Sequence, residues 1–263
     1  MAVGPTCSED NAAAMKVTRL AGAIGAEVSG VDLRRPPDAE LAAGLRRVWL
    51  EHGVVVLRGQ KLSSDEFLAF AATVGQPVEY PFVKGLEGYP TIIEVKKLEH
   101  ERVNFGGVWH SDTTYLQRPP MATMLLAREV PPPGGDTLLA SQAAAHDALS
   151  PGMRRLLAGM RCVNSSAKAD TSRTREDRIA EAGKADRRVY EAEHPAVCVH
   201  PETGRRALFM NVAHTVRFAD MTEEESKPLL QWLHAHQCKE EFTCRVRWQA
   251  GTLVLWDNRS TQH

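Results

Sequence analysis

The sequence has little of what a membrane protein, a nucleic-acid-binding protein or a secreted protein needs. Its 32 basic and 33 acidic residues give a formal net charge of -1, which creates no field that would attract a polyanion. No stretch holds the ~20 apolar residues of a membrane span, and the beginning of the chain lacks the basic and apolar regions of a signal peptide. We therefore expect a cytoplasmic protein that binds a small molecule, with no nucleic acid and no membrane as partner.

Cysteine is also scarce. The five cysteines are odd in number and form no C-x-x-C pair. They are scattered along the chain, at Cys7, Cys162, Cys198, Cys238 and Cys244. This pattern indicates neither a disulfide framework nor a zinc knuckle, and we expect reduced thiols.

Hydrophobic residues make up 43% of the 263 residues, enough for one substantial core, so we predict a single domain over residues 1–263. Helices are predicted where apolar residues recur at helical spacing behind a capping residue, over 38–52, 63–75, 150–161 and from 222 onward. Strands are predicted for short β-branched or alternating runs, at 54–57, 91–95, 121–127, 196–199, 207–210, 245–248 and 252–256. These elements favour a fold that is mainly β with flanking α-helices, built on a jelly-roll core.

Residues 164–188 differ from the rest of the chain. They are almost wholly polar or charged, and Ile179 is their only large aliphatic residue. Such a segment offers too little apolar surface to offset the entropy of ordering it. We predict a solvated insertion here, and a mobile lid over an active site is the sharper alternative.

The pair His110 and Asp112 is the strongest candidate for a functional site. In an extended backbone, residues i and i+2 project from the same face, and the flanking residues 106–107 and 113–115 are helix-poor. His263 follows the predicted strand 252–256. Two imidazoles and one carboxylate form the set that holds a non-haem ferrous ion and leaves positions open for substrate and oxygen. The sequence therefore predicts an iron site at His110, Asp112 and His263.

Other histidines are alternatives for the third position. His194, His200 and His214 are available, although a hydrogen-bonded or surface histidine is the more common role for each. His234 and His236 lie at the end of the helix that begins near residue 222, where their side chains diverge. We interpret these two as helix surface that complements the helix dipole.

Several motifs occur in order along the chain. They are Gly22–Leu33, Val108–Tyr115, Arg118–Pro120, Gly134–Thr137 and Leu255–His263. Together they resemble the taurine/alpha-ketoglutarate dioxygenase family (TauD/TfdA), and the likeness runs from about residue 18 to the end of the chain. Several ordered motifs at matching separations are far more specific than any one of them.

The resemblance implies a double-stranded β-helix, a cupin-like jelly roll, with His110, Asp112 and His263 as ligands of Fe(II). It also implies 2-oxoglutarate as cosubstrate, with Thr137 donating a hydrogen bond to its far carboxylate, and O2 as oxidant. The implied reaction hydroxylates a small organic acid and releases succinate and CO2. Family members carry an arginine for the cosubstrate beyond the distal histidine, so we expect the functional protein to continue past His263.

The implied substrate pocket differs from that of taurine-specific members. Tyr80 stands where those members place a histidine, and Gly106 where they place an asparagine, so two hydrogen-bond partners for a sulfonate are lost. The candidates for the pocket lining are Tyr80, Phe82, Gly106, Phe209 and Asn211, although core packing explains the two phenylalanines equally well. An alkyl sulfate, an alkyl sulfonate or an aryloxyalkanoate is expected in place of taurine.

Two other classes of function stay open. The same ligand types can hold zinc and activate water, which would make the protein a metal-dependent hydrolase. A non-catalytic binding protein on the same scaffold is the other alternative. Related folds often self-associate, so a homo-oligomer is compatible with the sequence, although no contact surface is evident.

Overall fold

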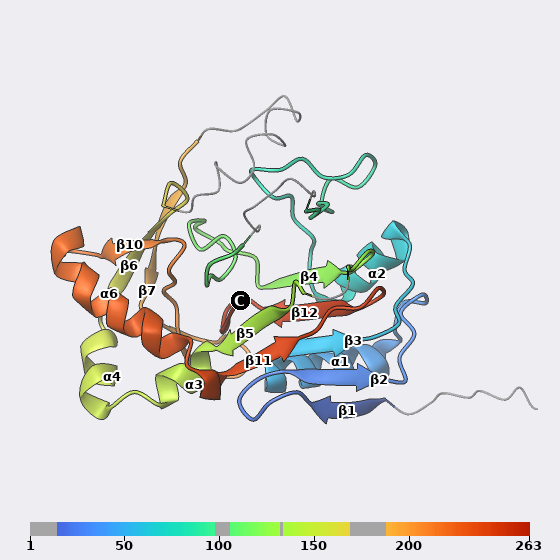
Figure 1. Cartoon of the computed structure of the whole chain (residues 1–263), viewed down its shortest axis with the longest axis horizontal. Coiled ribbons are helices and arrows are strands. Elements are labelled where there is room, and N and C mark those ends of the chain that lie inside the picture. Colours follow the sequence, from blue (N-terminus) through green and yellow to red (C-terminus); the bar gives the residue numbers. More distant parts are fainter. Residues whose placement is uncertain (1–14, 98–105, 132–133, 169–187) are drawn as a thin grey trace, which may run out of the picture.

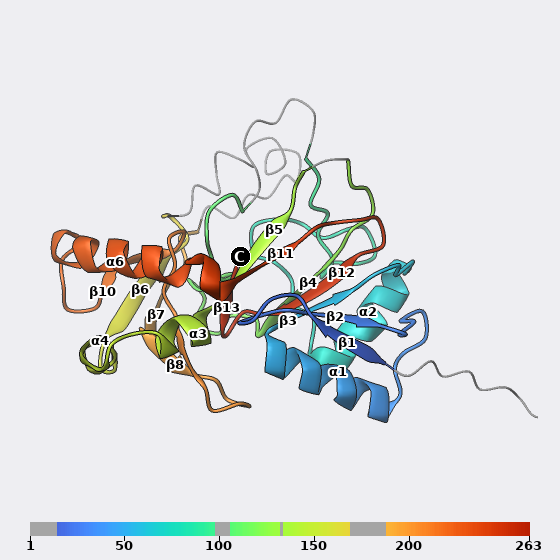
Figure 2. The same cartoon turned by 60° about the horizontal axis from the view of Figure 1, so that its bottom comes forward.

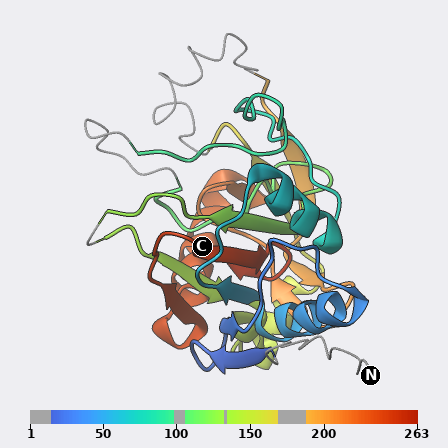
Figure 3. The same ribbon diagram turned by 90° about the vertical axis from the view of Figure 1, so that its right-hand side faces the viewer.

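The protein consists of β-sheets flanked by helices, as predicted, and its C-terminal end lies at the centre of the strands (Figure 1, Figure 3). The computed structural model describes residues 15–97, 106–131, 134–168 and 188–263. The strands are β1 (Lys16–Arg19), β2 (Ala26–Ser29), β3 (Val54–Leu57), β4 (Ala122–Leu126), β5 (Thr137–Ser141), β6 (Arg161–Ser165), β7 (Glu191–Pro195), β8 (Val197–Val199), β9 (Arg206–Leu208), β10 (Thr215–Phe218), β11 (Thr243–Val246), β12 (Leu253–Asp257) and β13 (Thr261–Gln262). The helices are α1 (Ala39–His52), α2 (Ser64–Val74), α3 (Gln142–Asp147), α4 (Pro151–Leu157), α6 (Glu223–Gln237) and the 3-10 helix η1 (Glu240–Phe242).

The largest sheet has the strand order β1-β2-β3-β12-β4. Its central strands β3 and β12 are antiparallel, with Val54 opposite Trp256. Because side chains alternate along a strand, Val55 and Leu57 pack on one face while Val54 and Val56 pack on the other. All four residues are buried, so β3 is covered on both sides.

Helices α1 and α2 cover the first face of this sheet (Figure 2). The Asp38 side chain caps α1 by accepting a hydrogen bond from the Leu41 amide, and the helix ends at Gly53, where φ is 70°. The helix directs Trp49, which is 1% exposed, against the sheet. Both predicted boundaries of this helix are therefore confirmed.

The second face packs against the sheet β11-β5-β13, which gives the predicted two-layered β core. Leu139 and Val246 from this sheet meet Val56 and Trp256 from the larger one. A separate core joins α3, α4 and α6 to the strands β6 and β9. The chain end that carries His263 follows β13, so it lies where the two β layers meet.

Two predicted elements differ in the structure. Residues 91–95 form no strand, because the backbone of Ile92 is used locally: its carbonyl accepts from the Leu86 amide and its amide donates to the Tyr89 carbonyl. The helix predicted over 150–161 ends at Leu157, and Arg161 opens β6 instead.

The polar segment also begins later than predicted. Asn164 and Ser165 belong to β6 and are buried, and Asn164 accepts a hydrogen bond from Thr215 at 2.7 Å. Residues 169–187 lie outside the described residues, so the insertion and the lid stay predictions.

Helix α6 begins at the predicted capping box, in which Thr222 and Glu225 exchange hydrogen bonds. The prediction that its histidines form helix surface is wrong. His236 is 5% exposed and donates to the Ala145 carbonyl at 2.8 Å, and both ring nitrogens of His234 are buried. The reason is that α3 and η1 cover the last turn of the helix. Among the described residues, no helix is long and apolar enough to cross a membrane.

A buried charge network fixes the end of β12. Asp257 is 1% exposed and accepts from the Arg259 guanidinium at 2.6 and 2.8 Å and from His200 Nε2 at 2.9 Å. Burial raises the pKa of Asp257, but Arg259 and His200 outweigh it and hold the pKa below its usual value. The pairing therefore stabilises the fold at pH values above the ordinary pKa of an aspartate, and this contribution is lost as the pH falls through the lowered pKa of Asp257.

Removing this carboxylate should destabilise the protein strongly, because the buried His200 Nε2 and two guanidinium nitrogens of Arg259 would lose their acceptor, whereas Arg259 would keep its contact with Glu202. We expect Asp257→Ala to lower the free energy of unfolding by about 3–5 kcal/mol, measured by urea denaturation. Asp32→Ala breaks an exposed pair with Arg34 and should leave the free energy of unfolding almost unchanged. Equal losses in the two variants would contradict this account of the network.

Candidate metal centre

The structure brings together the three predicted ligands. His110 Nε2 lies 3.5 Å from Asp112 Oδ1, and His263 Nε2 lies 3.9 Å from the same oxygen. The three ligand atoms all lie within 4.8 Å of one another, so a single ion could contact all of them. The donors are two imidazole nitrogens and one carboxylate oxygen, a set that suits a divalent transition metal.

The backbone joins the two histidines directly. The amide of His110 donates to the carbonyl of His263 at 3.0 Å, and the amide of His263 donates back to His110 at 2.9 Å. Ser111 adds a third link by donating to the Thr261 carbonyl at 2.8 Å. This reciprocal pair is the hydrogen-bonded pair of an antiparallel ladder, and it sets the two imidazoles side by side.

The prediction that His110 and Asp112 lie in a strand is wrong in part. His110 is extended and pairs with His263, but Asp112 begins a turn in which Thr113 has a φ of 50°. A left-handed conformation is strained for a β-branched residue and occurs mainly at functional sites. The turn at Asp112, and not the strand period, therefore aims its carboxylate at the histidines.

Hydrogen bonds leave the ligand atoms free. His110 Nδ1 donates to the Val108 carbonyl at 2.8 Å, so Nε2 keeps its lone pair. Asp112 Oδ2 accepts from the Thr123 hydroxyl at 2.6 Å, which leaves Oδ1 toward the histidines. The His263 ring packs between His110 and Trp256, with centroid separations of 4.2 and 4.6 Å.

The charges of the site favour a cation. Burial raises the pKa of Asp112, but His263, His110 and the Thr123 hydroxyl outweigh it and hold that pKa well below its usual value. Burial and the neighbouring His110 lower the pKa of His263 to about 4. Burial lowers the pKa of His110, but the hydrogen bond and charge of Asp112 outweigh it and raise the pKa. The ionised carboxylate of Asp112 and the neutral imidazole of His263 therefore favour the binding of a cation.

The alternative ligands lie elsewhere and have other partners. His194 contacts the Leu116 carbonyl at 2.9 Å, and His200 pairs with Asp257. His214 is 4% exposed and contacts the Thr114 hydroxyl at 3.0 Å, while its ring meets the ring of His110 edge to face at 6.1 Å. His214 thus supports His110 from the side and is not one of the clustered ligands.

A row of aromatic rings extends from His110 away from the other two candidate ligands. His214 contacts Tyr115 at a centroid distance of 4.9 Å, and Phe82 in turn packs on Tyr115 at 5.7 Å. Tyr80 and Tyr190 lie against Phe82 at 5.8 and 5.6 Å. The predicted lining residues Tyr80 and Phe82 therefore belong to one aromatic wall beside the site, whereas the sequence offered no signal for Tyr190.

The other predicted lining residues differ in their places. Asn211 is 1% exposed, and its side chain donates to the Thr114 hydroxyl and accepts from the His214 amide. It therefore supports the aromatic wall and does not line the pocket. Phe209 packs on His194. Gly106 lies against His110: an added Cβ would be 3.0 Å from the ring carbon Cε1, and φ is 69°. A side chain at Gly106 would therefore press on the ligand ring.

Thr137 is the first residue of β5 and half-buried. Its hydroxyl oxygen accepts a hydrogen bond from the Trp248 indole at 2.9 Å. Because the indole can only donate, the Thr137 hydroxyl hydrogen stays available for another acceptor.

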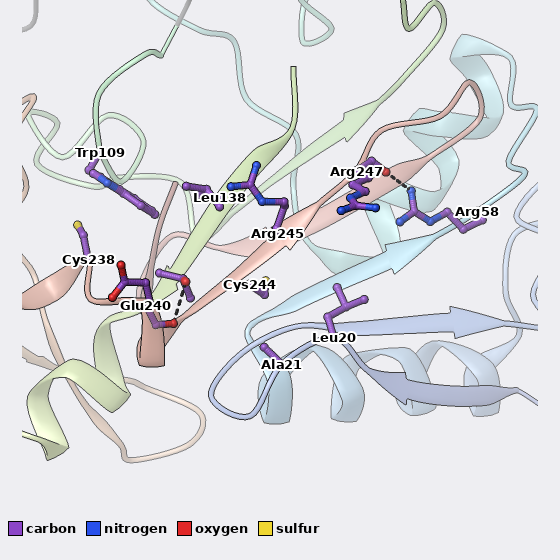
Figure 4. Close-up of a pocket in the computed structure, with 11 residues that line it drawn as sticks. Leu20, Ala21, Arg58, Trp109, Leu138, Cys238, Glu240, Cys244, Arg245 and Arg247 are labelled. Carbon is purple, nitrogen blue, oxygen red and sulfur yellow. Dashed lines mark hydrogen bonds between the residues drawn. The ribbon is translucent and has the colours of Figure 1, made fainter. Parts of the chain in front are cut away.

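A separate pocket of about 740 Å³ opens beside β11 (Figure 4). None of the three clustered ligands lines it, although Trp109 reaches its edge. Two of its arginines already have acidic partners, Arg58 with Glu27 and Arg245 with Asp136. Its positive charge is therefore largely compensated.

Comparison with known proteins assigns the family. Residues 16–263 match the family described as taurine catabolism dioxygenase TauD, TfdA family. The chain belongs to this family. An alpha-ketoglutarate-dependent sulfate ester dioxygenase of Pseudomonas putida is 34% identical to it over 257 residues, covering 95% of this chain and 83% of the relative. An alkylsulfatase of Acinetobacter baylyi is 32% identical, covering 95% of this chain and 79% of the relative.

Solved structures agree. A taurine dioxygenase from Burkholderia xenovorans matches with a TM-score of 0.78 and 33% identity, covering 94% of this chain and 81% of that chain. The TauD/TfdA match confirms three predictions: the family, the mainly β fold with a jelly-roll core, and the enzyme class of alpha-ketoglutarate-dependent dioxygenases.

Each clustered ligand should be required for metal binding. We expect His110→Ala, Asp112→Ala and His263→Ala to abolish stoichiometric binding of cobalt(II), which reports ligand replacement through its visible absorption. His194→Gln is the matched control, because it removes a half-buried histidine outside the cluster and should bind like the wild type. Retention of binding by any of the three ligand variants would refute the assigned set.

Protons should compete with the metal at His110. Its pKa lies above the ordinary 6.5, so the ring is protonated below that raised value and neutral above it. We expect the cobalt(II) affinity to fall about tenfold for each pH unit below the raised pKa, because one proton must leave. Calorimetric titrations across this range measure the slope, and a pH-independent affinity would contradict the assignment.

Proposed function

We propose that the protein is an iron(II)- and 2-oxoglutarate-dependent dioxygenase that hydroxylates a small organic acid, with an alkyl sulfate as the first candidate. The convergence of His110 Nε2, Asp112 Oδ1 and His263 Nε2 within 4.8 Å carries this proposal. Three ligands gathered in this way leave the remaining positions of an octahedral ion open. Bound ferrous iron would supply the redox centre at which O2 and 2-oxoglutarate are consumed to give succinate and CO2.

We assign binding of the cosubstrate carboxylate to Thr137. Strand β13 pairs antiparallel with β5, with Thr261 opposite Ser141 and Gln262 opposite Ala140. His263 follows β13 directly and Thr137 begins β5, so both lie toward the same end of this strand pair. A hydroxyl that already accepts from Trp248 can donate its hydrogen to an anion there.

The aromatic wall supports an apolar organic acid as substrate. Tyr80 and Phe82 are half-buried rings that pack on the buried Tyr115, and no asparagine side chain occupies the place of Gly106. Rings of this kind suit an alkyl or aryl chain better than a short amine. The relatives named for sulfate esters and alkyl sulfates add support for the first candidate.

The residues of this chain would bind the metal ion, orient the substrate and shield the site from water. Asp112 stays ionised beside the histidines, while Tyr115 and His214, 1% and 4% exposed, exclude water from one side of the site. Hydroxylation of the carbon that bears the sulfate oxygen forms a product whose C–O bond breaks. An alkyl sulfate, 2-oxoglutarate and O2 then give an aldehyde, sulfate, succinate and CO2. A sulfonate would release sulfite and an aryloxyalkanoate a phenol by the same step.

The proposal is tested by succinate formation from a panel of acids. We expect succinate and sulfate in equal amounts from an alkyl sulfate, only when ferrous iron, 2-oxoglutarate and O2 are all present. Taurine and an aryloxyacetate are the comparison arms, and Asp112→Ala is the inactive control. Sulfate release without O2 and 2-oxoglutarate would identify a hydrolase instead, and no turnover with any acid would overturn the proposal.

Thr137 has its own test in the same assay. Thr137→Val removes a hydrogen bond to a charged group, worth about 1.5–3 kcal/mol, so the KM for 2-oxoglutarate should rise at least tenfold. Thr137→Ser keeps the hydroxyl and should stay within about threefold of the wild type. An unchanged KM in Thr137→Val would exclude Thr137 from cosubstrate binding.

A further inference from the structure

A row of hydrogen bonds links Asn258, which lies five residues before His263, to the carboxylate of Asp112. Asn258, which follows β12, contacts the Thr123 hydroxyl oxygen through Nδ2 at 2.8 Å, and Thr123 on β4 contacts Asp112 Oδ2 at 2.6 Å. Asn258 is 2% exposed, and its backbone amide also donates to the Met121 carbonyl at 3.0 Å. Asn258 is therefore a buried anchor for this row of hydrogen bonds, whereas Thr123 and Asp112 are half-buried.

The direction of these hydrogen bonds is fixed. Asn258 Nδ2 also lies 3.3 Å from the Pro120 carbonyl, which can only accept, so the amide nitrogen and not its oxygen faces this side. The nitrogen then donates to Thr123, whose oxygen is the acceptor. The single hydroxyl hydrogen of Thr123 must point to Asp112 Oδ2.

We propose that Thr123, oriented by Asn258, is a positioning residue that keeps Asp112 a ligand through Oδ1 alone. This inference rests on the metal site of the proposed function. A carboxylate can bind a metal through one oxygen or through both. Engagement of Oδ2 by Thr123 favours the one-oxygen form, and a second oxygen on the ion would take a position that the cosubstrate or O2 needs.

The same arrangement ties the two ends of the ligand set together. Asn258 precedes the ligand His263 by one short turn, in which Ser260 donates to the Asp257 carbonyl and Thr261 opens β13. The segment that delivers His263 thus also orients, through Thr123, the carboxylate of the first ligand pair. A shift of this segment would displace two of the three ligands at once.

The test compares Thr123→Val with Thr123→Ser in oxygen-free cobalt(II) titrations. Valine has nearly the same shape but no hydroxyl, so we expect the cobalt(II) affinity to change by about 10–100-fold, with an altered visible spectrum and weaker binding of 2-oxoglutarate to the loaded protein. Serine keeps the donor and should restore all three values to within about threefold. Thr73→Val is the matched control, since it loses a hydroxyl whose one hydrogen-bond partner among the described residues is the Phe70 carbonyl on α2.

A second variant tests whether Asn258 acts through Thr123. Asn258→Ala should disturb metal and 2-oxoglutarate binding in the wild-type background and add less than twofold in the Thr123→Val background, because the hydroxyl it orients is gone. Thr123→Ala replaces Thr123→Val if the valine variant does not fold, as judged by circular dichroism.

The outcomes separate the two proposals. Failure of the wild type to bind cobalt(II) would overturn the proposed function itself. A wild type that binds, together with a Thr123→Val variant of unchanged affinity, spectrum and 2-oxoglutarate binding, would overturn only the role of Thr123. Additive effects of the two substitutions would overturn the relay from Asn258.

Discussion

The reciprocal backbone pair between His110 and His263 is the contact on which the site depends. Two hydrogen bonds of 3.0 and 2.9 Å join residues that are far apart in the sequence, and each residue also carries a nitrogen of the candidate ligand set. Backbone pairing of this kind fixes the positions of both Cα atoms, so the imidazoles need only their ordinary rotamers to face Asp112. The two candidate histidine ligands are therefore placed by backbone pairing.

The packing of the sheets makes that pair possible. β12 is buried on both faces and leads through the turn that begins at Asp257 into β13. The pairing of β13 with β5 fixes the position of the backbone just before His263. The fork between Asp257 and Arg259 holds the first residue of this turn, and the contact between Asn258 and Thr123 holds the next one. Neighbouring residues of one turn thus serve stability and the proposed site.

Much of this arrangement could be predicted from the sequence, because local chemistry determines it. The capping boxes at Ser63 and Thr222 start their helices as expected, and the β-branched run 54–57 forms a central strand. The predictions that failed had two causes. Residues 91–95 have strand composition but close a local turn, whereas His236 is buried by a tertiary contact with α3. Nothing in the sequence marks Thr123, whose role follows only from the strand beside it.

The central claim is that one metal ion binds between His110, Asp112 and His263. Anomalous X-ray scattering from a crystal grown with manganese(II) and 2-oxoglutarate tests it most directly. The account predicts one strong peak in contact with His110 Nε2, Asp112 Oδ1 and His263 Nε2, with Asp112 Oδ2 still bonded to Thr123. A peak at other residues, or density for the ion with either histidine turned away from it, would contradict the account.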